Sequence, residues 1–121
     1  MNIYEREAAD YLLNCLSEEL AEQAQEVCKM RRFGVDGMCP VAGVTNSDKF
    51  SGEAADAEAI KLLLKAVGVP LPVHIFDSER TRTKILRTVE FAVFSVERKV
   101  LSPKAFRLIE KGAESAIRFS Y

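Results

Sequence analysis

The sequence predicts an all-α protein: a bundle of four to five helices in one domain spanning residues 1–121. The chain has 121 residues, of which only ten are glycine or proline (6 and 4), and 48% are apolar. Few turn residues in a chain of this length favour a small number of long helices over many short strands. Apolar residues also recur every three or four positions, which is the period of a helix packed along one face.

The first predicted helix runs from about Tyr4 to Phe33, because Gly34 is a typical helix terminator. Its apolar residues form one stripe, which is typical of a helix face packed on a core. The members of this stripe are Leu13, Leu16, Leu20, Ala24 and Val27. Residues 35–45 are rich in turn-forming residues and predict a loop.

The second predicted helix begins near Asn46 or Ser47, which are both good N-caps, and runs to about Val67. Gly68 follows it, with two prolines just beyond. Its apolar stripe contains Phe50, Ala54, Ala57, Ile60 and Leu64. A short extended segment, residues 71–76, then leads to the next cap at Asp77-Ser78.

The third predicted helix covers about Glu79 to Leu101, with Phe91 and Phe94 on the side opposite its inner face. Two apolar faces on one helix predict burial on both, so we expect an oligomer interface there. Ser102-Pro103 is an N-cap followed by proline at the first helical position, and the last helix runs to about Phe119. The expected inner faces are Ile85, Val89, Ala92, Val96 and Val100 in the third helix, and Phe106, Ile109, Ala113 and Ala116 in the fourth.

The composition of the chain argues against several classes of function. The formal net charge is −1, which does not indicate a general electrostatic affinity for nucleic acid. The charged N-terminus is unlike a signal peptide, and the apolar runs are too short to span a bilayer, so we expect no membrane partner. Three cysteines without CxxC spacing predict free thiols. Together these features indicate a cytoplasmic protein.

Two acidic motifs carry the functional information. The first predicted helix contains Glu18-Glu19-Leu20-Ala21-Glu22, and the second contains Glu53-Ala54-Ala55-Asp56. Each motif places two acids three residues apart, on one side of a helix. Glu19 and Glu22 border the apolar stripe of their helix, whereas Glu53 falls inside the stripe of the second. A carboxylate on a packing face is costly unless a positive charge lies beside it.

Magnesium is the natural partner for such a set of carboxylates, because it prefers oxygen ligands and retains water and substrate phosphates in its shell. We therefore predict that Glu19, Glu22, Glu53 and Asp56 bind Mg²⁺, with Mn²⁺ as a substitute. Lysine or arginine is the alternative source of positive charge. One such acidic pair is commonly just a solvated helix face, and it is the presence of two pairs on consecutive helices that favours a site.

These motifs resemble the all-alpha nucleotide pyrophosphohydrolases of the MazG-like superfamily, whose pattern is EExxE on one helix and ExxD on the next. The resemblance covers residues 10 to 98 in outline. It includes residues 16–22 and 53–56, the segment Lys29-Met-Arg-Arg-Phe-Gly34, Asn46, and the third helix with Lys84, Arg87 and Ser95.

The resemblance implies the matching fold, an assembly as homodimer or homotetramer, and hydrolysis of a nucleoside or deoxynucleoside triphosphate to the monophosphate and pyrophosphate. Metal-bound carboxylates would neutralise phosphate charge and activate a water molecule. Glu19 or Glu22 is the expected catalytic group that orients or deprotonates this water. The expected substrate-binding residues are Lys29, Arg32, Asn46, Lys84 and Arg87, although each also has an ordinary structural interpretation as exposed charge or, for Asn46, as a cap.

Two other interpretations remain open at this point. The same scaffold would suit a nucleotide-binding protein without catalysis, or a helical interaction protein whose acids pair with basic residues of a partner subunit. Within the enzymes, hydrolysis of phosphoribosyl-ATP is a less favoured option than general nucleoside triphosphate hydrolysis.

Overall fold

The computed structural model describes residues 1–38 and 43–119, and its described part is all-helical. It contains no strand there, only one isolated bridge between Met38 and Thr45. This confirms the prediction of an all-α fold. The helices are α1 (Ile3–Phe33), α2 (Asn46–Ala66), α3 (Ser78–Glu97) and α4 (Pro103–Phe119). No helix in the described ranges has the length and apolar character needed to cross a membrane.

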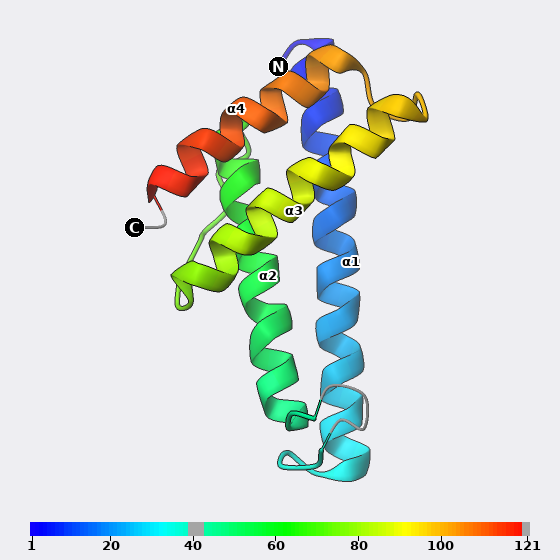
Figure 1. The fold of residues 1–121 in the computed structure, drawn as a ribbon, viewed down its shortest axis with the longest axis vertical. Helices are drawn as coiled ribbons and strands as arrows, with labels where there is room; N and C mark the ends of the chain where they lie inside the picture. The colour runs from blue at the N-terminus through cyan, green and yellow to red at the C-terminus, as the bar shows by residue number, and fades with distance from the viewer. Residues whose placement is uncertain (39–42, 120–121) are drawn as a thin grey trace.

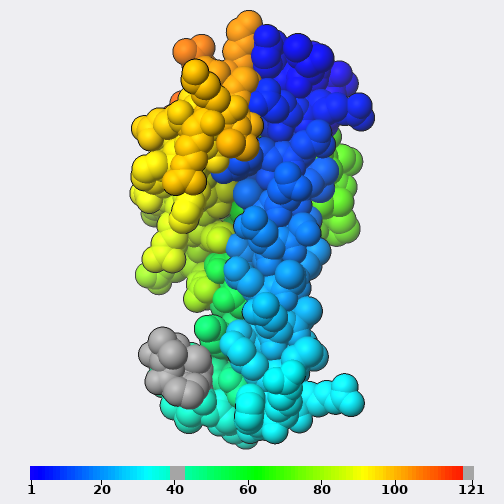
Figure 2. All heavy atoms as spheres, turned by 90° about the vertical axis from the view of Figure 1, so that its right-hand side faces the viewer, coloured from blue at the N-terminus to red at the C-terminus, as the bar shows by residue number. Residues whose placement is uncertain are grey.

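The two longest helices form an antiparallel hairpin. In Figure 1, α1 descends from the N-terminus and α2 returns beside it, while α3 crosses the pair diagonally and α4 lies across one end. The other end of the hairpin, where α1 ends and α2 begins, extends beyond α3 and α4 (Figures 1 and 2). The molecule therefore has a four-helix body and a two-helix arm.

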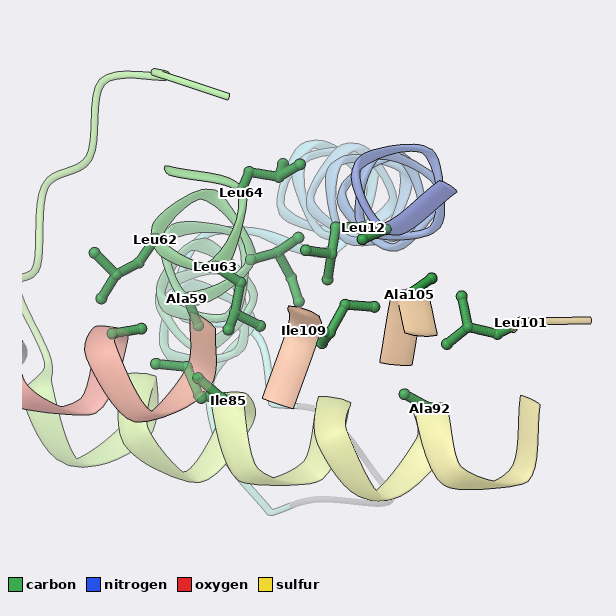
Figure 3. Close-up of a cluster of buried hydrophobic side chains, with 14 residues drawn as sticks. Leu12, Ala59, Leu62, Leu63, Leu64, Ile85, Ala92, Leu101, Ala105 and Ile109 are labelled. Atoms are coloured by element: carbon green, nitrogen blue, oxygen red, sulfur yellow. The ribbon is translucent and has the colours of Figure 1, made fainter. Parts of the chain in front are cut away.

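The hydrophobic core lies in the body, where all four helices meet (Figure 3). Leu12 of α1, Leu63 of α2, Ile85 of α3 and Ile109 of α4 are completely buried there. Burying each large aliphatic side chain contributes about 1.5–3 kcal/mol. On α1 the core cluster contains only Ala8 and Leu12, so it ends before the acidic motif begins.

Of the three caps that the sequence predicts, Asp77 and Ser102 are confirmed, whereas α1 begins at a cap that was not predicted. Asn2 forms a capping box with Glu5 at the start of α1. Asp77 caps α3 by accepting from the Arg80 amide, and Ser102 accepts from the Ala105 amide at the start of α4. The cap of α2 is Thr45, one residue before the expected position, and its hydroxyl accepts from the Asp48 amide.

The apolar stripe predicted on α1 is not its packing face. Leu13, Leu20 and Val27 are 41%, 50% and 50% exposed, whereas Glu19 and Glu26 are buried. The face of α1 that packs in the structure is the flank of this stripe, which contains Ala8, Leu12 and Glu19. Four of the five stripe residues thus face solvent, and only Leu16 packs against the core.

The third helix also differs from expectation at its end. It stops at Glu97 instead of Leu101, and Lys99 adopts a positive φ of 60°. The amides of Val100 and Leu101 both donate to the Ser95 carbonyl, at 2.9 and 3.2 Å. This turn buries Leu101 in the core and leaves Val100, predicted to face inward, 71% exposed.

Candidate metal and phosphate site

The hairpin brings three of the four predicted metal ligands together. One carboxylate oxygen from each of Glu19, Glu22 and Glu53 lies within 4.8 Å of the other two. Glu19 and Glu22 come from adjacent turns of α1, and Glu53 approaches from α2, which runs antiparallel beside it. Two helices therefore build a cluster that neither could form alone.

The cluster lacks enough positive charge of its own. Glu19 is 5% exposed, and its Oε1 accepts from Lys84 Nζ at 2.5 Å. The second oxygen of Glu19 and Oε2 of Glu53 are buried without a hydrogen-bond partner in the described structure. Leaving a buried carboxylate oxygen unsatisfied costs about 1–3 kcal/mol or more. Both oxygens are thus free to accept from a cation or its bound water.

The pKa of Glu53 is raised by its burial among the other carboxylates. Burial raises it to about 7, helped by a hydrogen bond with Glu22 and by the negative charges of Glu22, Asp56 and Glu19. Burial also raises the pKa of Glu19, and the nearby Lys84 only partly opposes that shift. Ionisation of Glu53 and Glu19 is therefore disfavoured unless a further cation lies beside them.

Asp56 lies outside this group of three. Its two oxygens accept from Arg80 Nε at 2.9 Å and from Nη2 at 3.0 Å, a bidentate ion pair with α3. Asp56 still contributes negative charge to the cluster, because it raises the pKa of both Glu19 and Glu53. In this structure its predicted role as a metal ligand is replaced by pairing with an arginine.

Gly52 makes room for that arginine. A Cβ atom at position 52 would lie 2.7 Å from Arg80 Nη1 and 2.9 Å from its Cζ, closer than real Cβ contacts. The guanidinium consequently crosses α2 directly against the backbone at Gly52 and reaches Asp56 one helical turn away.

Basic residues of α3 form a second wall of the site. Arg80, Lys84 and Arg87 line a cleft of about 340 Å³ together with Asp56 and three other residues. Lys84 connects this cleft to the acidic cluster through Glu19. Burial lowers the pKa of Lys84, but the hydrogen bond and charge of Glu19 outweigh burial and the pKa is raised overall. The lysine therefore stays charged, as phosphate binding requires.

Sequence reasoning selected Lys84 and Arg87 but missed Arg80. The signal was present: Arg80, Lys84 and Arg87 are spaced by four and three residues and so share one helix face. Arg80 also follows the Asp77 cap by three residues, which places it in the first turn of α3, next to the acids of α2.

The other three predicted substrate-binding residues lie elsewhere. Lys29 pairs with Glu26 at 3.1 Å, and with Arg32 it lines a separate depression on α1. From the rise of roughly 1.5 Å per residue, they lie about 10 and 15 Å along the helix beyond Glu22. Asn46 is buried, and its Nδ2 donates to the Gly34 carbonyl at 3.4 Å. It holds the α1–α2 connection together and does not face the cluster.

A larger groove opens on the other side of the acids, between α1 and α3. It has a volume of about 620 Å³ and shares Glu19, Glu22 and Lys84 with the cluster. Its remaining walls are mostly uncharged side chains: Tyr11, Asn14, Cys15, Glu18, Ile60, Thr88, Phe91, Ser95 and Val100. Burial raises the pKa of the Cys15 thiol to about 11, so this cysteine is a neutral, unreactive part of the wall.

Comparison of the chain with family models, curated proteins and solved structures finds no match. The function of the chain is therefore inferred from the geometry of the site. The donor set of the site fits a hard divalent cation such as Mg²⁺, because all donors are carboxylate oxygens and two of the three residues, Glu19 and Glu53, each have a buried oxygen without a partner. One face of the cluster is open because Glu22 is exposed.

The raised pKa of Glu53 predicts a specific pH dependence of stability in the absence of metal. A carboxyl whose pKa is higher in the folded state contributes most to folding stability below the pKa it has in the unfolded chain, about 4.3. That contribution is lost as the pH rises through the folded-state pKa of Glu53, about 7. Glu53→Gln mimics the protonated form. At pH 8 in EDTA it should raise the free energy of unfolding by about 1–2 kcal/mol, discounted because solvent reaches part of the site. Urea unfolding at pH 5 and 8 measures this. An equal effect at both pH values would contradict the assignment.

The close approach at Gly52 is testable by a double-mutant cycle. Gly52→Ala should improve helix propensity by about 0.5–1 kcal/mol. In the wild type, this gain is offset by displacement of Arg80 from Asp56, a partly exposed pair worth up to about 1 kcal/mol. In an Arg80→Ala background no such loss occurs. Unfolding measurements should therefore show Gly52→Ala stabilising the Arg80→Ala protein alone, and equal stabilisation of both backgrounds would exclude the contact.

Proposed function

We propose that this protein is a magnesium-dependent pyrophosphohydrolase that cleaves a nucleoside triphosphate, ribo- or deoxyribo-, to the monophosphate and pyrophosphate. The observation that supports this most is the convergence of Glu19, Glu22 and Glu53, with two buried carboxylate oxygens that lack partners. Glu19, Glu22 and Glu53 would hold a divalent cation, which would neutralise phosphate charge and lower the pKa of a water molecule.

The neighbouring residues suit the remaining steps. Lys84 and Arg87, joined by Arg80, are placed to bind phosphate oxygens and stabilise negative charge as the bond between the α- and β-phosphates breaks. Between the two catalytic candidates, Glu22 is better placed to accept the proton of the attacking water. It is exposed and forms no ion pair with a described residue, whereas Glu19 is buried against Lys84.

Assembly as a homodimer or homotetramer is part of this proposal. Leu13, Leu20 and Val27 are seven residues apart along α1, so they form a straight exposed seam of the kind that packs against another helix. At about 100° per residue, this seam lies on the side of α1 opposite Tyr11 and Glu18, which line the groove. Two copies could therefore pack through α1 and leave the site accessible.

The activity is tested by release of pyrophosphate from the common ribo- and deoxyribonucleoside triphosphates with Mg²⁺, Mn²⁺ or EDTA. We expect turnover of at least one triphosphate with metal and none with EDTA. Glu22→Gln and Glu53→Gln should each reduce kcat by about 10²-fold or more, because each removes a metal-binding or proton-accepting group. Glu114→Gln, at an exposed position on α4, is the control and should retain full activity.

Binding of nucleotide and metal without release of pyrophosphate would replace the enzymatic proposal with a nucleotide-binding function. Absence of both binding and turnover would instead favour a helical interaction protein. The internal pairs Lys84–Glu19 and Arg80–Asp56 would then be its structural compensation for buried acids.

The assembly is tested by sedimentation of the wild type and of Leu20→Lys. We expect the wild type to sediment as a dimer or tetramer, and the lysine to shift it to monomer by placing a charge in the centre of the seam. Phe94→Lys tests the other surface, the exposed face of α3 on which the sequence predicts an interface. Loss of the oligomer in this variant, with Leu20→Lys still assembled, would place the interface on α3 instead of α1. A monomeric wild type at micromolar concentration would remove the oligomer from the proposal.

A further inference from the structure

The groove between α1 and α3 has the properties of a subsite for the non-phosphate part of the ligand. Its volume of about 620 Å³ lies within the usual range of small-molecule sites, roughly 300–1,000 Å³. One end contains Glu19, Glu22 and Lys84, which are charged, and the rest is formed mainly by apolar and neutral polar side chains. A ligand with a charged end and a flat, weakly polar end matches this division.

Phe91 is the most informative residue of the groove. It is 70% exposed although it is a large aromatic side chain, and it lines the same cavity as the catalytic acids. Phe94, one turn later, is similarly exposed at 56% but is not among the residues that line this groove. An exposed aromatic ring beside a phosphate site is the usual platform on which a nucleic acid base stacks.

A polar contact lies in the same wall. Tyr11 and Ser95 hydroxyls are 2.9 Å apart, and Ser95 also donates to the Phe91 carbonyl at 3.4 Å. Either hydroxyl can donate across the contact between Tyr11 and Ser95, and in both cases the Tyr11 oxygen keeps a lone pair available as an acceptor. The wall thus offers an acceptor suited to an N–H of a base or a hydroxyl of a sugar.

We propose that this groove binds the nucleoside of the substrate, with the base stacked on Phe91 and a donor group of the base or sugar hydrogen-bonded to Tyr11. The inference rests on the proposed function, because it takes the triphosphate to be held at the acids and at Lys84. It assigns recognition of the nucleoside to α1 and α3, and recognition of the phosphates to the α1–α2 acids and the basic face of α3.

The experiment uses reaction products as probes, so that hydrolysis does not complicate binding. Calorimetry with Mg²⁺ compares inorganic pyrophosphate, which has no nucleoside, with the ribo- and deoxyribonucleoside 5′-monophosphates. Phe91→Ala should weaken binding of the preferred monophosphate by about tenfold and leave pyrophosphate binding unchanged, as expected for loss of one stacked base. Phe94→Ala is the matched control and should change neither.

Tyr11→Phe provides a second variant that keeps the ring and removes the acceptor. It should weaken monophosphates by about fivefold without affecting pyrophosphate, the loss expected for one hydrogen bond. A loss confined to ribonucleotides would identify the sugar hydroxyl as the donor, and a loss that follows the base would identify the base.

The outcomes separate the two proposals. If the wild type binds pyrophosphate but no monophosphate, or if Phe91→Ala binds monophosphates as tightly as Phe94→Ala does, the groove proposal is overturned and the metal site remains. If the wild type binds neither pyrophosphate nor Mg²⁺, the proposed function fails and the nucleoside subsite fails with it.

Discussion

Three carboxylates facing one another between α1 and α2 are the constraint on which the rest of this structure depends. A helix hairpin ordinarily buries apolar side chains at the interface between its two helices. Here the buried residue of α1 at that interface changes from Leu12 to Glu19 within two turns. Repulsion among the acids and their partial removal from water both oppose the pairing of the helices. The hairpin persists because other contacts outweigh this cost and because positive charge is brought to the acids.

The body of the protein supplies both conditions. Its core joins α1 and α2 immediately next to the acids, through Leu12 and the buried end of α2, so the two helices cannot separate there. The core also fixes α3 across the hairpin, which places Lys84 on Glu19 and Arg80 on Asp56. The same crossing helix carries Phe91 to the far side of the acids, so one element organises both clefts.

Lys84 and Arg80 compensate the acids only in part, and this leaves the cluster able to accept a further cation. A fully paired cluster would be inert, since each carboxylate would already have its cation. Here only two basic side chains, Lys84 and Arg80, pair with a group of four acids. The pKa of Glu53 is raised to about 7 as a result of burial and of the neighbouring negative charges. In the proposed function, a divalent ion would supply the missing two charges, and the basic side chains of α3 would bind phosphate.

The sequence predicted the helices well because their ends depend on local chemistry. Asp77 and Ser102 each accept a hydrogen bond from an amide three residues later, which requires no knowledge of the tertiary fold. The grouping of Glu19, Glu22 and Glu53 was likewise accessible, because i and i+3 spacing fixes the face and consecutive helices tend to pack together.

The remaining features depend on the rotation of each helix about its axis, which the sequence does not specify. On α1, two overlapping faces were available: the apolar seam of Leu13, Leu20 and Val27, and the flank that contains Ala8, Leu12 and Glu19. The sequence pattern favours the seam, because its residues are larger and more apolar. The small Ala8 lets α1 approach the other helices closely, and the core therefore forms on the flank. For the same reason the pairing of Asp56 with Arg80 was missed, since it requires α3 to cross at Gly52.

That choice of face explains why the acids and the exposed seam occur together. Because α1 is rotated so that its flank faces α2, Glu19 and Glu26 are buried in the hairpin and the apolar seam is left exposed. The buried acids and the unpartnered apolar surface therefore have the same cause. The arm beyond α3 has few apolar contacts of its own, because the interface between α1 and α2 contains Glu26 and Asn46 there. A second helix packed on Leu20 and Val27 would stabilise this arm from the outside. It would hold Glu22 and Glu53 in register without covering the groove, which lies on the opposite side of α1.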